Sequence, residues 1–193
     1  MKSAHGYFLS LLLSETFNCR KDIYGIDRTL AIREIISKIT ETEPGIILDL
    51  RISLLEGINS KDEDLIYKSS LLSKLVDTEV DIISISNGIY NINKDMIYPP
   101  KSDGSNVYLD YGIYFSKKYP KKIWNIAGNI DDFYVIDKIE AENLTFSIGR
   151  LLLSDPYAIV KASRFDDDKI NNCNGCNRCH YYSHSEGSLT QCI

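Results

Sequence analysis

Four short runs of mostly apolar residues, separated by segments with helical spacing, constrain the fold of this chain more than any other feature. The runs cover residues 46–52, 80–86, 122–127 and 144–148. Apolar runs of this length that are rich in β-branched residues and bounded by turn residues are typical of strands. Strands that alternate with helices pair in parallel, so the sequence predicts an α/β fold.

Helical periodicity fills the segments between these runs. Apolar residues recur about every 3.6 positions in residues 28–39 and 61–76, and we expect further helices over residues 108–119 and 131–140 and near residues 155–162. The strands look almost continuously apolar rather than alternating. This pattern predicts a sheet that is covered by helices or closed into a barrel.

Composition excludes several classes of protein. The chain has 193 residues, 44% hydrophobic and 25% charged, as in an ordinary single globular domain. A formal net charge of −5 argues against a nucleic-acid partner, which needs a basic surface. No apolar run approaches the roughly 20 residues of a membrane helix, and the first residues lack a signal-peptide pattern. We therefore expect a soluble, cytoplasmic protein that binds neither nucleic acid nor membrane.

Small and polar residues follow each predicted strand, and barrels and open α/β sheets bind ligands at those ends. Glycine allows backbone N–H groups to approach an anion closely, and an arginine offers a bidentate donor to phosphate oxygens. The ends of the last two strands therefore form a candidate phosphate site made of Gly128, Asn129, Gly149 and Arg150. The alternative is that these are two ordinary turns that happen to contain glycine.

Four of the five cysteines crowd the last 21 residues with the spacing C-x2-C-x2-C-x12-C: Cys173, Cys176, Cys179 and Cys192. A disulfide framework would spread its cysteines along a small secreted chain, so this cluster indicates metal or redox chemistry. Four thiolates suit an iron–sulfur cluster or zinc, and the spacing does not separate the two. His180 and His184 are alternative ligands, and Cys19 is interpreted as a loop thiol. The remaining alternative is four free thiols.

The N-terminal segment resembles a known family. Residues 4–10 (AHGYFLS) and 18–25 (NCRKDIYG) resemble the segment after the fourth barrel strand of the old yellow enzyme family. These FMN-dependent NADH:flavin oxidoreductases carry H-x-A-[HN]-G-Y-L-L and then N-x-R-x-D-x-Y-G-G. Three further segments resemble the ends of the family's fifth, seventh and eighth strands, in family order: residues 50–53, 127–129 and 149–156.

The resemblance implies the second half of a TIM (β/α)8 barrel, strands five to eight, because a complete barrel needs about 250 residues. It implies a partial FMN-binding barrel domain over residues 1–162 and a Cys-rich, iron–sulfur-like segment over residues 163–193. Three departures stand out. Lys2 replaces the family's first histidine, the segment around Ile26 is about three residues shorter, and the cysteine run is compressed.

The resemblance also implies an activity and roles for individual residues. NAD(P)H would reduce FMN, and the flavin N5 would pass a hydride to an activated alkene such as an enone or enoyl thioester. Tyr7 matches the family's proton donor, and His5 matches a residue that binds the substrate carbonyl. Arg51 matches the arginine at the flavin N1/O2 edge, with pairing to Asp49 or Glu56 as its alternative. The phosphate candidate would hold FMN, and the cysteines would hold a [4Fe–4S] cluster, with zinc as the alternative.

Two other interpretations remain open. The chain is a non-catalytic fragment that binds metal through its C-terminal cysteines, or one subunit of a split enzyme whose N-terminal half is a separate chain. In either case we expect weak or no FMN binding by the chain alone and self-association through its outer strands. We also expect apolar inward faces without an opposite layer at Ile47, Ile83, Ile126 and Phe146.

Overall fold

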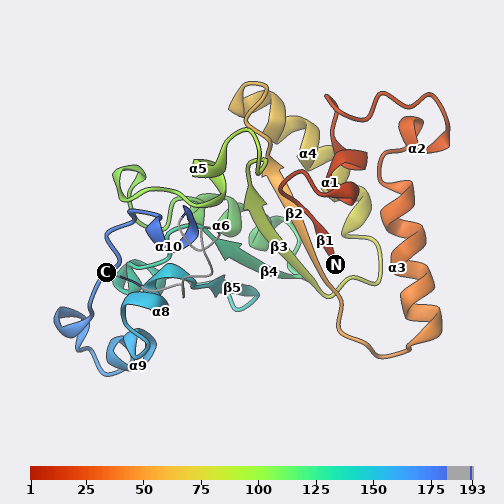
Figure 1. The fold of residues 1–193 in the computed structure, drawn as a ribbon. Coiled ribbons are helices and arrows are strands. Elements are labelled where there is room, and N and C mark those ends of the chain that lie inside the picture. Colours follow the sequence, from red (N-terminus) through yellow and green to blue (C-terminus); the bar gives the residue numbers. More distant parts are fainter. Residues whose placement is uncertain (182–191, 193) are drawn as a thin grey trace.

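The fold is built on one parallel sheet. The computed structural model describes residues 1–181 and 192. Its five strands follow one another across the sheet in chain order, as Figure 1 shows. They are β1 (Lys2–Ser3), β2 (Asp49–Leu55), β3 (Ile82–Asn87), β4 (Ile123–Ala127) and β5 (Leu144–Ser147). Sequential parallel strands joined by helices confirm the α/β fold and are consistent with part of a TIM-barrel-like fold.

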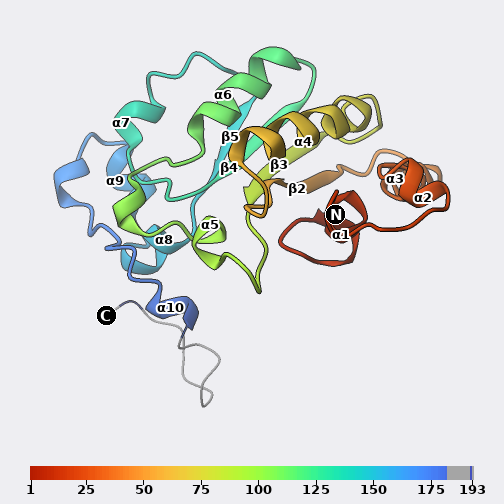
Figure 2. The same ribbon diagram turned by 90° about the horizontal axis from the view of Figure 1, so that it is seen from above.

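Three helices of ten residues or more accompany the strands, and Figure 2 shows α4 and α6 along one side of the sheet. They are α3 (Leu30–Thr42), α4 (Lys61–Leu75) and α6 (Leu109–Lys118). The shorter helices are α1 (Phe8–Leu13), α2 (Ile23–Ile26), α5 (Lys94–Ile97), α7 (Phe133–Ile136), α8 (Arg150–Ser154), α9 (Ala158–Ala162) and α10 (Arg178–Tyr181). Within the described residues, none of the helices has the length and apolar character that crossing a bilayer requires.

Two strand positions differ from the sequence prediction. The strand predicted from residue 46 begins at Asp49, and Ile46 and Ile47 lie outside it with 46% and 73% of their surface exposed. The two-residue strand β1 was not predicted, because two residues carry no periodicity. It pairs Lys2 with Arg51 and so extends the sheet by one strand.

The core lies between the sheet and the helices. The apolar side chains of the middle strands are fully buried, and they pack with α3, α4 and α6 in one cluster: Leu50, Ile52, Leu54, Ile83, Ile85, Trp124 and Ile126. Gly112 of α6 illustrates the close fit, since a Cβ there would lie 2.4 Å from Cγ1 of Ile126. The Phe115 ring stacks on Trp124 with 5.1 Å between the ring centroids. Burial of this apolar surface holds the helices on one side of the sheet.

The opposite face of the sheet is polar. The strand register aligns five polar side chains in one row across all five strands: Lys2, Arg51, Ser84, Asn125 and Thr145. The row is linked by hydrogen bonds, such as the one from Asn125 Nδ2 to Thr145 Oγ1 at 3.1 Å. The strands therefore alternate in character, and the sheet buries its apolar side chains on the helix side alone.

This alternation corrects the expectation of uncovered apolar inward faces. Ile83 and Ile126 are fully buried in the core, and Phe146 packs against that core. Ile47 lies before β2 begins. The serines at positions 84 and 86 set the period of two, and the sequence interpretation overlooked them among the surrounding isoleucines.

A buried ion pair joins the end of β2 to α1 and α4. Lys68 Nζ lies 2.5 Å from Glu56 Oε1, and both side chains are at most 4% exposed. Ser14 Oγ donates to the other Glu56 oxygen at 2.6 Å, and Asp64 accepts from the Glu56 backbone N–H at 2.8 Å. Burial lowers the pKa of Lys68, because loss of water disfavours the ammonium form. Glu56 is therefore the charge that keeps this lysine tolerable in the interior.

Removal of one partner tests this dependence. We expect Lys68→Met to lower the free energy of unfolding by about 3–5 kcal/mol, since it leaves the Glu56 carboxylate buried and unpaired. The control is Lys74→Met, whose half-exposed ammonium lies 3.3 Å from Asp27 and whose loss should cost at most about 1 kcal/mol. Urea unfolding followed by circular dichroism measures both. Equal costs for the two variants would contradict the assigned role of the buried pair.

Candidate functional site

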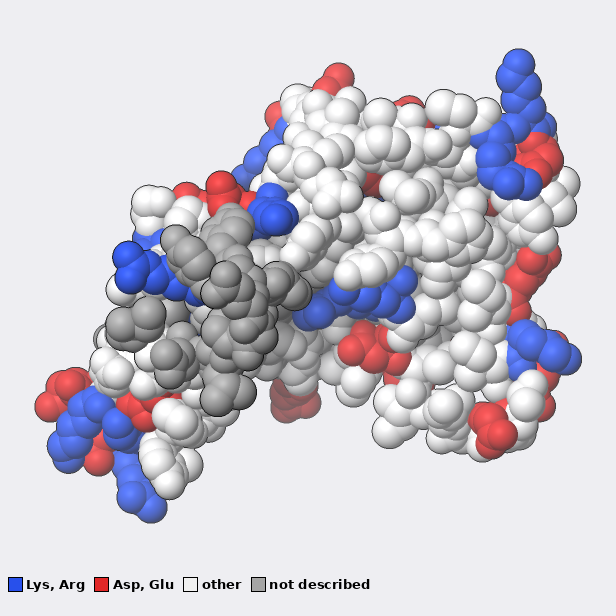
Figure 3. Space-filling view, viewed as in Figure 1, with Lys and Arg blue, Asp and Glu red and all other residues white. Residues whose placement is uncertain are grey.

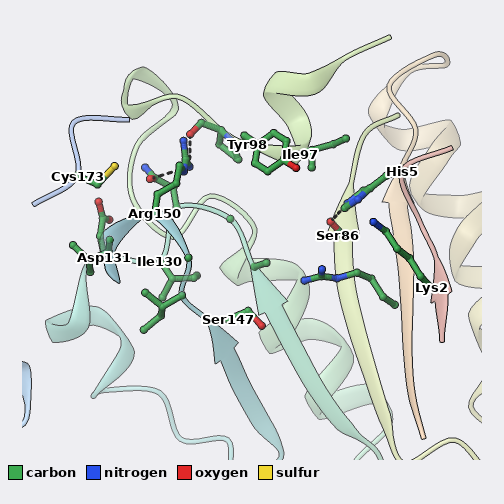
Figure 4. A pocket seen from close by; sticks show the side chains of 18 residues that line it. Lys2, His5, Ser86, Ile97, Tyr98, Ile130, Asp131, Ser147, Arg150 and Cys173 are labelled. Carbon is green, nitrogen blue, oxygen red and sulfur yellow. Dashed lines mark hydrogen bonds between the residues drawn. The ribbon is translucent and has the colours of Figure 1, made fainter. Parts of the chain in front are cut away.

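A cavity of about 300 Å³ opens at the carboxyl ends of the strands, on the open side of the sheet. Figure 3 shows Lys and Arg atoms near the middle of this face, and Figure 4 shows the side chains around the cavity. Six residues singled out from the sequence line it: His5, Arg51, Gly128, Asn129, Gly149 and Arg150. The structure therefore brings the proposed cofactor residues together in one place, as expected for the ends of parallel strands.

Arg150 forms one end of the cavity. It is the first residue of α8, and its guanidinium donates to the Pro99 carbonyl at 2.7 Å and to Asn129 Oδ1 at 3.4 Å. It also donates to Asn177 Oδ1. In the described part of the chain, no carboxylate lies within ion-pair distance of it. This end of the cavity therefore carries a positive charge that is held in place by neutral acceptors.

The two glycines at this end have different physical reasons. Gly128 has φ +141°, and a Cβ there would lie 2.5 Å from the Tyr108 ring, so close packing alone explains it. A Cβ at Gly149 would meet nothing within 4 Å, so its backbone borders open space in the cavity wall. Asn129 adopts a left-handed backbone, with φ +52°. Of these three, Gly149 offers the clearest room for an anion.

Arg51 lies at the other end of the cavity and is not paired in either of the ways the sequence left open. Asp49 accepts a hydrogen bond from Ser84 Oγ at 3.0 Å, and Glu56 pairs with Lys68. Neither carboxylate lies within ion-pair distance of the Arg51 guanidinium. The charge of Arg51 is therefore available to a bound ligand.

His5 is buried beside Arg51 and is held by two serines. Its backbone has φ +62°, an uncommon value for a residue with a side chain. Its backbone N–H donates to Ser53 Oγ at 2.9 Å, and its ring Nε2 is hydrogen-bonded to Ser86 Oγ. Ser86 is a residue for which the sequence suggested no role, because it lies 81 positions away from His5.

The surroundings of His5 keep its ring neutral. Burial, followed by the charges of Lys2 and Arg51, lowers the pKa of His5 from 6.5 to about 4. At neutral pH the imidazole therefore has one N–H donor and one acceptor nitrogen. Its hydrogen bond to Ser86 determines which nitrogen remains for a ligand.

Tyr7 lies beside the cavity rather than in its wall. Its side chain precedes α1 and is 53% exposed. The Lys2 ammonium lies 4.1 Å from the centroid of its ring, a distance typical of a cation–π contact. The structure thus places the phenol next to the cationic end that also holds Arg51 and His5.

The four C-terminal cysteines line a second, much smaller cavity of about 10 Å³: Cys173, Cys176, Cys179 and Cys192. Burial and the nearby Cys173 raise the pKa of the Cys179 thiol. Arg150 and Cys173 line both cavities, so the two are contiguous. Over residues 1–181 and 192, no group of three or more His, Cys, Asp or Glu side chains is placed to hold a metal ion.

The alternative ligands lie elsewhere. The His180 ring packs on Tyr98 with 4.0 Å between centroids, and its Nε2 is hydrogen-bonded to the Tyr90 hydroxyl at 3.2 Å. His184 lies outside the described residues. Cys19 is exposed, and its thiol contacts the Thr16 carbonyl at 3.6 Å, as expected for a loop thiol.

Comparison with known proteins finds similarity at the level of structure. No protein-family model and no curated protein matches the sequence. The solved structure of 2-naphthoyl-CoA reductase with 2-naphthoyl-CoA has a TM-score of 0.78 and 19% identity, and the match covers 99% of this chain and 30% of that one. The 6-hydroxypseudooxynicotine amine oxidase of Pseudomonas geniculata has a TM-score of 0.71 and 17% identity, with 93% and 27% covered. This chain thus shares its fold with less than a third of two redox enzymes.

The low pKa of His5 predicts a pH-dependent stability. The unfolded chain takes up a proton on His5 near pH 6.5, whereas folded His5 stays neutral down to about pH 4. The free energy of unfolding should therefore fall by about 3 kcal/mol from this residue as the pH drops through that range. Urea unfolding between pH 4 and 7 measures this.

The matched variant is His5→Asn, because asparagine tolerates a positive φ and hydrogen-bonds through its amide. It should remove this part of the pH dependence and leave a flatter curve. Parallel curves for the two proteins would contradict the neutral, buried state of His5.

Proposed function

We propose that this chain is part of a flavin-dependent oxidoreductase of the old yellow enzyme type, and that FMN lies along the 300 Å³ cavity. The observation that carries the proposal is the placement of two guanidinium groups, unpaired with carboxylates of the described residues, at opposite ends of that cavity. Arg150 would hold the phosphate, and Arg51 would face the N1/O2 edge of the flavin ring. The shared fold with two redox enzymes supports it.

The residues present fit such a ligand. A guanidinium has five N–H groups, and Arg150 uses three of them on Asn177, Pro99 and Asn129, so two remain for phosphate oxygens. Gly149 leaves open space beside it. At the other end, a cation next to the N1/O2 edge stabilises the negative charge that this edge carries in the reduced state.

In the proposed reaction, bound FMN supplies a hydride to an electron-poor double bond after reduction by NAD(P)H. The chain's own residues act on the substrate. The His5 ring polarises a substrate carbonyl by a hydrogen bond, with its orientation fixed by Ser86. The Tyr7 hydroxyl donates a proton to the carbon next to that carbonyl. An enone or an enoyl thioester has the required double bond conjugated to a carbonyl.

We also propose that the four C-terminal cysteines hold a [4Fe–4S] cluster, with zinc as the alternative. Support comes from their common position around one small cavity that adjoins the proposed flavin cavity at Arg150 and Cys173. Thiolates are the usual ligands of both centres. This part of the proposal rests on the grouping of the thiols.

A second candidate function is that of one subunit of a split enzyme, or of a metal-binding fragment without activity. The matches cover 30% and 27% of the two solved chains, so most of each of those enzymes has no counterpart here. Within the described residues, β1 pairs with β2 alone and β5 with β4 alone. Their outer edges therefore present backbone groups to which strands of a separate N-terminal half or a second copy can add.

The flavin proposal is tested by titrating FMN with the chain and following the quenching of flavin fluorescence. We expect weak binding, and Arg51→Met and Arg150→Met should each reduce the affinity about tenfold or more, because each removes a charge-assisted hydrogen bond. Arg164→Met, at an exposed position away from the cavity, is the matched control. Equal affinity in all four proteins, or no binding by any of them, would contradict the site.

The metal proposal is tested by anaerobic purification followed by analysis of iron, sulfide and zinc. We expect iron and sulfide with broad visible absorbance, and loss of both in Cys176→Ser, since each thiolate is a ligand. Cys19→Ser should retain the full content. Zinc without sulfide would assign the site to zinc, and protein with neither metal would refute the site.

A further inference from the structure

Two like charges lie side by side at one end of the cavity. Lys2 of β1 and Arg51 of β2 are register partners on adjacent parallel strands, and both line the cavity. Adjacent strands lie about 4.8 Å apart, and like charges in such positions repel each other. Unless something offsets it, this pair therefore costs stability.

Nearby carboxylates do not offset these charges. Asp49, on the same face of β2, accepts from Ser84 Oγ. Asp131, an acidic residue of the cavity wall, pairs with Lys101. In the part of the chain that the structure describes, no carboxylate lies within ion-pair distance of Lys2 or Arg51, although the chain carries a net charge of −5. The group that offsets this pair must come from outside the described chain.

A neutral donor completes this end of the cavity. His5 lines it, with Nε2 engaged by Ser86, and no hydrogen bond from Nδ1 to the described residues is present. Figure 4 shows His5, Ser86 and Lys2 together on one side of the cavity and Arg150 on the other. Two cations and an imidazole thus surround a space that is separate from the Arg150 end.

We propose that Lys2, Arg51 and His5 form a subsite for the carboxylate group of a small-molecule substrate. The planar guanidinium of Arg51 matches the two oxygens of a carboxylate, and the Lys2 ammonium adds a point charge. The assignment to a substrate rests on the proposed function, in which Arg150 at the far end takes the phosphate. Because Lys2 also contacts the Tyr7 ring, the anchored carboxylate lies next to the proposed proton donor. The proposal selects unsaturated acids over uncharged enones.

The test uses the chain without flavin and takes the His5 side chain as its probe in an NMR pH titration. Acetate is the ligand, with chloride replaced at constant ionic strength. A bound carboxylate opposes the field of Lys2 and Arg51, so acetate should raise the His5 titration midpoint saturably by about 0.5 or more. Lys2→Gln should abolish this rise, and Lys2→Arg should keep it.

Lys38→Gln is the matched control, since Lys38 is 79% exposed on α3, and it should respond to acetate like the unmodified chain. An acetate response that persists in Lys2→Gln, or none in the unmodified chain, would overturn the subsite. An equal, Lys2-dependent response to inorganic phosphate would overturn its assignment to carboxylate. Circular dichroism verifies that each variant is folded.

The outcome is independent of the flavin experiment. A Lys2-dependent acetate response without FMN binding supports the subsite and removes the flavin from the proposed function. FMN binding without an acetate response supports the flavin site and overturns the subsite.

Discussion

The register of the parallel sheet is the constraint on which the core and the candidate site both depend. Leu50, Ile52 and Leu54 face the helices and are fully buried, and this fixes Arg51 and Ser53 on the other face. A shift by one residue would exchange the two sets and bury a guanidinium against α4. The same hydrophobic packing that stabilises the fold therefore also aims the charges into the cavity.

The charge of the cavity depends on where the acidic residues are used. Glu56 follows directly after β2, close in sequence to Arg51, but it is buried with Lys68 on the helix side. Asp131 lies in the cavity wall, but Lys101 neutralises it. A net negative chain thus maintains a locally cationic site, because its nearest carboxylates already have partners. Loss of either pairing would release a carboxylate near the cavity.

Sequence periodicity and chain order predicted the strands and the shared position of the strand ends, because both follow from local pattern and parallel pairing. Arg51 and Arg150, nearly one hundred positions apart, therefore meet in one cavity as expected. What the pattern did not predict depends on pairing between distant residues. The role of Ser86 requires contact with His5, and the position of Lys2 requires β1, which two residues cannot announce. Ser84 shows why the polar face was missed, since single serines among isoleucines do not interrupt an apolar average.

The polar face also changes what an incomplete barrel costs. A chain that matches about 30% of a longer enzyme would expose a large apolar surface if its inner face were apolar, and such a surface drives aggregation. Here that face carries side chains such as Asn125 and Thr145 that water solvates well. What remains unsatisfied lies at the outer edges of β1 and β5, where backbone groups need partners. A partner for this chain would therefore add strands at these edges, and hydrogen bonds rather than apolar burial would supply most of the specificity.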